Sequence, residues 1–287
     1  MFTFLKKKPV IQILTCMHAR PKVSELFALS IQRLKKHFAG TYHIRVFAVI
    51  SDAESEAVCN QYGIPFHFTE NLPLGRKWNS GLKEVMAFDF DYLLIGSDDD
   101  IMSNQLLESY RPYIRKNIPH FGIKSLGFYC CQTQRALIFK YKYKTTKLVG
   151  CGRMLSRGLL EDVALRMEVK IQGPIQGFTK GSTCILSYKQ ASYFKAMDSV
   201  LFLSEKPNWS LWENTINRGL DNSCESYLVS QNYIPIVVPS EKILITDIKS
   251  SVNIWTFQSF IKLSTEVHPD QVLDFFSSKE KEHLSKV

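Results

Sequence analysis

The chain has 287 residues, of which 45% are hydrophobic and 22% are charged, and this balance excludes a largely disordered protein. The net charge of +9 favours an anionic partner such as a nucleotide, nucleic acid or membrane phosphate, although solubility alone would also account for it. No apolar run approaches the roughly 20 residues of a membrane-spanning helix, no signal peptide is evident, and the seven cysteines form no CxxC pair. We therefore expect a cytoplasmic protein without a transmembrane segment, for which peripheral contact with a membrane stays open.

Strand and helix patterns alternate through the first hundred residues. Apolar runs predict strands at 10–14, 43–51, 64–70 and 91–96. Apolar residues at helical spacing, with Pro or Gly at the ends, predict helices at 22–38, 53–63 and 76–88. This alternation is typical of an α/β fold with a mostly parallel central sheet flanked by helices, and such sheets bind ligands at the carboxyl ends of their strands.

The pattern is less regular after residue 120. We expect paired strands at 126–133 and 135–142, a glycine-bounded loop that opens a helix within 149–167, and a flexible loop at 172–182. Further along, the sequence predicts a helix at 189–200, a loop and helix at 211–231, and a strand at 234–239. The segment 268–287 reads as one terminal helix whose polar end frays.

Three consecutive carboxylates, Asp98, Asp99 and Asp100, follow the apolar strand that ends near Ile95. They cannot all stay ionised close together without an opposing charge. Hard oxygen ligands suit Mg²⁺ or Mn²⁺, and in an extended segment Asp98 and Asp100 would turn to the same side. The alternative interpretation is a polar turn that caps the helix expected to begin near Ser103.

In this arrangement the chain resembles the nucleotide-diphospho-sugar transferases of the GT-A fold, similar to the family-2-like glycosyltransferases of phages and bacteria. The sequence "SDDD" after "DYLLIG" stands where that superfamily carries an Asp-any-Asp motif. The resemblance implies that Asp98 and Asp100 bind a divalent ion. It also implies that Asp98 and Asp99 contact the nucleotide sugar.

Three other segments match the superfamily in order. In "ILTCMHARP" the resemblance places Thr15 beside the nucleotide base, and in "VFAVISDAES" it lets Asp52 accept from a uracil ring. In "NLPLGRKWNSGL" it places Lys77 and Asn79, with Arg76 adjacent, at the diphosphate. A helix N-terminus with a lysine is a favourable diphosphate site. Taken singly, Asp52 reads equally as a helix cap and Lys77 as a solvated helix residue.

The second half matches less closely. Its segment "LWENTINRGLDNSCESYL" holds Asp221, the expected base for an acceptor hydroxyl, and Glu225 as the reserve candidate. Arg153, after two glycines, could meet phosphate, as could Asp247 or Lys249. The resemblance implies a nucleotide-sugar-binding half over 1–118 and an acceptor-binding, catalytic half over 119–287, packed as a single domain with an irregular C-terminal region.

The expected activity is a metal-dependent transfer, with Mn²⁺ or Mg²⁺, from a nucleotide-diphosphate sugar to a hydroxyl acceptor. A UDP-sugar is the expected donor, and the acceptor is a glycan, a lipid-linked saccharide or a modified nucleic acid. A sugar-1-phosphate nucleotidyltransferase is an alternative, but "TCMHARP" lacks the glycine-rich loop that this class needs after its first strand. A non-catalytic, basic nucleic-acid-binding protein is another, which leaves the three carboxylates unexplained.

Overall fold

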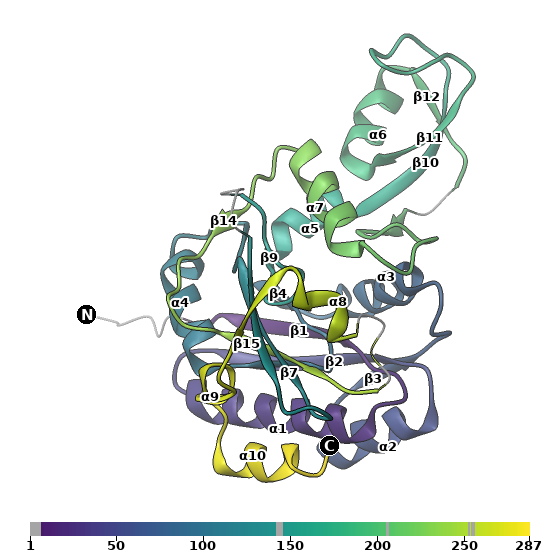
Figure 1. Ribbon diagram of the computed structural model, residues 1–287. Coiled ribbons are helices and arrows are strands. Elements are labelled where there is room, and N and C mark those ends of the chain that lie inside the picture. Colours follow the sequence, from purple (N-terminus) through teal and green to yellow (C-terminus); the bar gives the residue numbers. More distant parts are fainter. Residues whose placement is uncertain (1–6, 142–145, 205–206, 252, 254–255) are drawn as a thin grey trace.

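The computed structural model describes residues 7–141, 146–204, 207–251, 253 and 256–287. Its central sheet has seven strands in the order β14-β6-β9-β4-β1-β2-β3 (Figure 1). The strands are β1 (Val10–Cys16), β2 (His43–Ile50), β3 (Phe66–Phe68), β4 (Tyr92–Ile95), β6 (His120–Gly122), β9 (Met154–Ser156) and β14 (Ile236–Val237). All are parallel except β9, which runs antiparallel between β4 and β6. The predicted mixed α/β fold with a mostly parallel central sheet is therefore confirmed.

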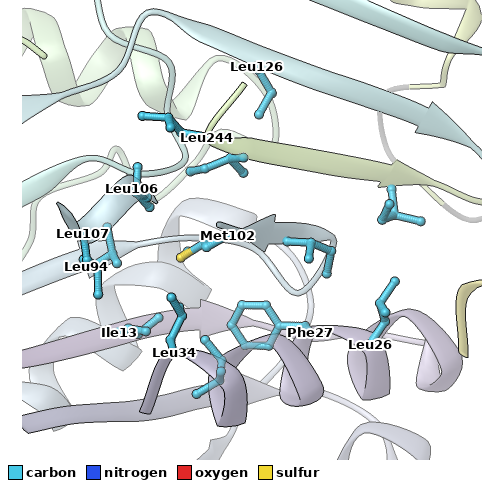
Figure 2. Packing of buried hydrophobic residues seen from close by; sticks show 14 of the residues in the cluster. Ile13, Leu26, Phe27, Leu34, Leu94, Met102, Leu106, Leu107, Leu126 and Leu244 are labelled. Carbon is cyan, nitrogen blue, oxygen red and sulfur yellow. The ribbon is translucent and has the colours of Figure 1, made fainter. Parts of the chain in front are cut away.

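Three helices follow the strands of the first half, as the alternation predicts. They are α1 (Pro21–Phe38), α2 (Ala53–Tyr62) and α3 (Leu74–Val85). Helix α1 begins with proline, whose fixed φ suits a first helical position, and α2 ends at Gly63 with a φ of 62°, which favours glycine. Figure 2 shows Phe27 and Leu34 of α1 packing toward Ile13 of β1 and Met102, so that α1 covers one face of the sheet.

A second sheet of five strands, in the order β16-β8-β7-β15-β5, stands against the central one. Its members are β5 (Asp100–Met102), β7 (Ser125–Cys130), β8 (Ala136–Lys140), β15 (Ile245–Lys249) and β16 (Ser264–Val267). The expected pairing of 126–133 with 135–142 is confirmed as the antiparallel pair β7 and β8. Strand β5 pairs antiparallel with β15, and this register sets Asp100 opposite Asp247.

A third, smaller sheet projects from the body with helix α6 (Tyr188–Ala196) on it (Figure 1). It contains β10 (Leu165–Ile171), β11 (Thr183–Ser187), β12 (Val200–Phe202) and β13 (Asn208–Trp209). Within 149–167 a loop containing Gly150 and Gly152 precedes the helix α5 (Arg157–Val163), as expected, but the expectation missed β9 before the helix and the start of β10 after it. The period-two burial of Met167, Val169 and Ile171 makes β10 a strand, and β9 is too short to show a period.

The C-terminal prediction was also wrong, because the segment forms two short helices, α9 (Asp270–Leu273) and α10 (Ser278–Leu284). Ser277 and Glu280 form a capping box at the start of α10. Buried Glu280 also accepts from Nε of Arg33 on α1 at 3.0 Å, which holds α10 to α1. Fraying of the polar end stays a prediction.

The remaining helices are α4 (Asn104–Arg115), α7 (Leu220–Ser230) and α8 (Gln258–Ile261). Strands β6, β9 and β14 come from beyond residue 119, so both halves of the chain contribute to the central sheet. Within the described part of the chain, no helix combines the length and apolarity needed to cross a bilayer.

Candidate active site

The three consecutive carboxylates lie at the carboxyl end of β4, and all of them are buried. Asp98 and Asp99 form a turn, and Asp100 opens β5. The backbone N–H of Ser97 donates to Oδ2 of Asp100 at 2.7 Å, which folds the segment back. The predicted extended segment is therefore absent here, and Asp98 and Asp100 meet different partners. The turn does not cap α4, since the hydroxyl of Ser103 accepts from the Leu106 N–H at 3.2 Å.

Arg20 supplies the positive charge at Asp98 and Asp99. Its guanidinium forms an ion pair with Asp98, and its Nη1 lies 2.6 Å from Oδ2 of Asp99. The hydroxyl of Ser24 donates to the other oxygen of Asp98 at 2.5 Å, and the Asn253 amide donates to Asp99 at 2.6 Å. Although burial by itself lowers the pKa of Arg20, the charges of Asp98 and Asp99 outweigh it and raise that pKa.

The sequence reasoning did not select Arg20. Its position offered one signal, because it follows the exit of β1 directly before Pro21. In a parallel sheet that exit lies at the same edge as the exit of β4.

A second group of charges surrounds Asp100. Asp247 faces it from β15, and Nζ of Lys249 lies 2.7 Å from Oδ2 of Asp247. The other oxygen of Asp247 is buried and has no hydrogen-bond partner among the described residues. Burial raises the pKa of Asp100 well above its ordinary value, and that of Asp247 to about 7. Among the described residues, Lys249 is the cation that forms an ion pair with this pair of carboxylates, and the pair favours one further proton or cation.

The raised pKa of Asp247 predicts a pH-dependent stability. Its carboxyl group holds a proton in the folded chain at pH values where the unfolded chain has lost it. The contribution of this proton to the free energy of unfolding is fully present below about pH 4, and it is lost as the pH rises through about 7. At about 1.4 kcal/mol per pH unit, the loss is at most about 4 kcal/mol. Urea unfolding should show that the free energy of unfolding falls more steeply from about pH 5 to pH 8 in wild type than in Asp247→Asn. Parallel profiles would contradict this assignment.

Thr15 and Asp52 lie at the ends of β1 and β2, where the predicted base site was placed. Thr15 is fully buried, and its hydroxyl has no partner within the described part of the chain. Asp52 caps α2 by accepting from the Ser55 N–H at 2.8 Å, and it also accepts from the Ala19 N–H at 3.0 Å. Burial opposes these bonds, yet they lower the pKa of Asp52. The interpretation of Asp52 as a helix cap is thus correct. A contact between Asp52 and a nucleotide base stays a prediction.

Lys77 is 1% exposed, so its interpretation as a solvated helix residue was wrong. Its ammonium donates to the Met17 carbonyl at 2.7 Å, to the Ser51 hydroxyl at 2.9 Å and to the Asn71 amide oxygen at 3.0 Å. Burial lowers its pKa, whereas the nearby charge of Asp98 acts in the opposite sense. Lys77 therefore joins the loops that leave β1, β2 and β3, close to the carboxylates.

Arg76 and Asn79 differ from Lys77 in their surroundings. Arg76 is exposed on α3. Asn79 is buried and points into the second half of the chain, where it accepts from the N–H groups of Leu211 and Trp212 at 2.9 and 3.1 Å. Its amide donates to the Trp212 carbonyl at 2.7 Å. The side chain is thus fully used in joining α3 to this segment.

Asn79→Ala should lower the free energy of unfolding by about 2–4 kcal/mol, because it leaves two buried N–H groups without acceptors. Ser80→Ala on the same helix is the control, since the Ser80 hydroxyl contacts only the carbonyl of Lys77, three residues before it. Urea denaturation of both variants checks the prediction, and equal small losses would contradict it.

The candidate bases lie on α7 beside the segment 148–153. Glu225 accepts from Nη2 of Arg153 and from the Leu148 N–H, both at 3.1 Å. The carboxyl group of Asp221 lies against Gly150, where a Cβ would come within 2.0 Å of its Cγ. Asp221 is exposed at the surface, yet desolvation by the neighbouring chain raises its pKa, and the charge of Arg153 opposes this. Asp221 is therefore the freer of the two carboxylates, while Glu225 is committed to an ion pair.

Cys151 connects the two carboxylate groups. Its thiol hydrogen-bonds with Asp100, and its pKa is raised first by burial and then by the charges of Asp100, Asp247 and Asp221. The segment around Cys151 therefore has the predicted metal site on one side and the predicted base on the other.

Comparisons with known proteins complete the description. No family model matches the sequence, and no curated protein matches it. Among solved structures, the chain is similar to glucosyl-3-phosphoglycerate synthase from Mycobacterium tuberculosis in complex with Mn²⁺, UDP and glucosyl-3-phosphoglycerate. The identity is 14% and the TM-score 0.34, over 54% of this chain and 59% of that one.

Similarity to S. aureus TarS gives 12% identity and a TM-score of 0.33, over 54% and 49% of the two chains. Similarity to a mycobacterial protein gives 11% identity and a TM-score of 0.35, over 54% of this chain and 55% of that one. The chain thus spans about half the length of these proteins. At such identities and scores, the similarities assign neither a family nor an activity.

Proposed function

We propose that the protein is a glycosyltransferase of the GT-A type that uses a nucleotide-diphosphate sugar. The observation that carries the proposal is the buried run Asp98–Asp100 at the carboxyl end of β4, with Lys77 close to it. This is the edge at which open α/β sheets bind ligands. Buried carboxylates without equal positive charge are costly for stability, so their presence favours a role in binding.

The carboxylates fit a divalent cation at Asp100. Asp247 faces Asp100, and one buried oxygen of Asp247 has no partner among the described residues. Mg²⁺ and Mn²⁺ are commonly held by one or two carboxylates together with substrate phosphates. In the described part of the chain, no three His, Cys, Asp or Glu residues group as metal ligands. When bound, such an ion stabilises the charge on a departing diphosphate.

The chain's own residues would bind and orient the substrates. Exposed Arg76 would contact the diphosphate, while Lys77 would fix the loops that surround the base. Asp221 would accept the proton of the acceptor hydroxyl, for which a raised pKa is suitable. Residues 1–118 would thus bind the donor, expected to be a UDP-sugar. Residues 119–287 would bind a glycan, a lipid-linked saccharide or a modified nucleic acid.

A donor screen tests the proposal. Release of nucleoside diphosphate from UDP-, GDP- and dTDP-sugars would be measured with Mn²⁺, with Mg²⁺ and with chelator. We expect one donor to be hydrolysed slowly, and transfer to a suitable acceptor to fall by about 10²–10⁴ in Asp221→Asn. Asp198→Asn, at an exposed position in the turn between α6 and β12, is the matched control. Absence of turnover with every donor would contradict the proposal.

A further inference from the structure

Arg20 is held firmly at the carboxylates by its own loop. Ala19 adopts a left-handed φ of 50°, which is uncommon outside glycine, and its N–H bonds to Asp52 at 3.0 Å. Pro21 then starts α1, so the backbone on both sides of Arg20 is fixed. The side chain is 11% exposed and reaches Asp98 and Asp99 together. The loop therefore positions a permanent cation at the end of β4.

The charges around Arg20 do not balance. Four buried carboxylates, Asp98, Asp99, Asp100 and Asp247, meet three cations. Arg20 and Lys249 form ion pairs with them, and the charge of buried Lys77 acts on Asp98. An ion pair that served stability alone would be matched in charge, because each uncompensated buried carboxylate is costly. Arg20 thus pairs directly with Asp98 and Asp99, whereas among the described residues no ion pair links it to Asp100 or Asp247.

We infer that Arg20 is an internal cation that competes with a divalent ion for Asp98 and Asp99. In the free protein the guanidinium occupies both oxygens that a metal would need from this turn, and a metal is confined to Asp100 and Asp247. A nucleoside diphosphate offers the guanidinium another partner, because arginine binds phosphate in a bidentate manner. The inference rests on the proposed cation site, and it gives Arg20 a positioning role in that site.

Mn²⁺ binding to the free protein tests the inference. Electron paramagnetic resonance of unbound Mn²⁺ would be followed during titration of wild type, Arg20→Ala, Arg20→Gln and Arg20→Lys. We expect binding at least about tenfold tighter in Arg20→Ala and Arg20→Gln, because a unit charge next to two carboxylates has been removed. Arg20→Lys keeps the charge and should bind Mn²⁺ like wild type. In the two neutral variants, Mn²⁺ should also raise the midpoint of thermal unfolding.

Arg33→Ala is the matched control, because Arg33 lies about three and a half turns further along α1 and pairs with Glu280. It should lose stability without gaining affinity for Mn²⁺. Equal Mn²⁺ affinity in wild type and the neutral variants would overturn the inference, as would a gain in Arg20→Lys. A neutral variant that folds only with Mn²⁺ present would support it. Because no sugar nucleotide is added, the outcome is independent of the donor screen.

Discussion

Asp100→Asn is expected to reduce sugar transfer by about a thousandfold or more, because it removes a carboxylate that faces the proposed metal and diphosphate. The fold should survive the change. The asparagine oxygen can still accept from the Ser97 N–H, which donates to Asp100 at 2.7 Å in the native chain. One negative charge is lost from a group that has an excess of them. Stability above about pH 7 should therefore rise while activity falls.

These opposite changes separate a functional carboxylate from a structural one. Transfer rate and urea unfolding would be measured on the same preparations, with Asp89→Asn as the control. Asp89 is highly exposed and pairs only with Lys7 among the described charges. The free energy of unfolding should therefore change by no more than about 0.5 kcal/mol, and the transfer rate by no more than the factor that corresponds to this energy. If Asp100→Asn were both active and less stable, the carboxylate would belong to the framework of the turn.

The sequence could predict the position of the three carboxylates because that position follows from local patterns. An apolar run followed by polar residues marks the end of a buried strand, and alternation with helices makes the sheet parallel. Lys77 was selected through the resemblance of its segment to the diphosphate-binding loop and helix of the transferases. Its burial was not predicted, since the three acceptors that surround it come from separate loops.

The direction in which Arg20 points and the pairing of Asp100 with Asp247 could not be predicted from the sequence. Asp247 follows Asp100 by 147 positions, and only the register between β5 and β15 brings them together. The direction of Arg20 depends on the left-handed backbone at Ala19, which its residue type does not indicate. Short strands such as β9 were missed because three residues show no periodicity. Contacts that depend on long-range register thus decide which charges at this edge are neutralised.

Replacement of Arg153 is expected to have a large effect on the stability of the fold. The residue is 2% exposed, and its guanidinium is 3.1 Å from Glu225, which it holds beside the segment 148–153. Arg153→Met should lower the free energy of unfolding by about 3–5 kcal/mol, because it leaves the Glu225 carboxylate without its partner.

The double variant Arg153→Met, Glu225→Leu should recover part of this loss, since two apolar side chains leave no unpaired charge. The loss of unfolding free energy that remains in the double variant reflects the Leu148 N–H, which would no longer have Glu225 as its acceptor. Urea unfolding of the two single variants and the double variant measures the coupling. Additive losses would contradict the ion pair, whereas a positive coupling would show that Glu225 serves to hold Arg153. In that case Asp221 is left as the carboxylate free to accept a proton from the acceptor.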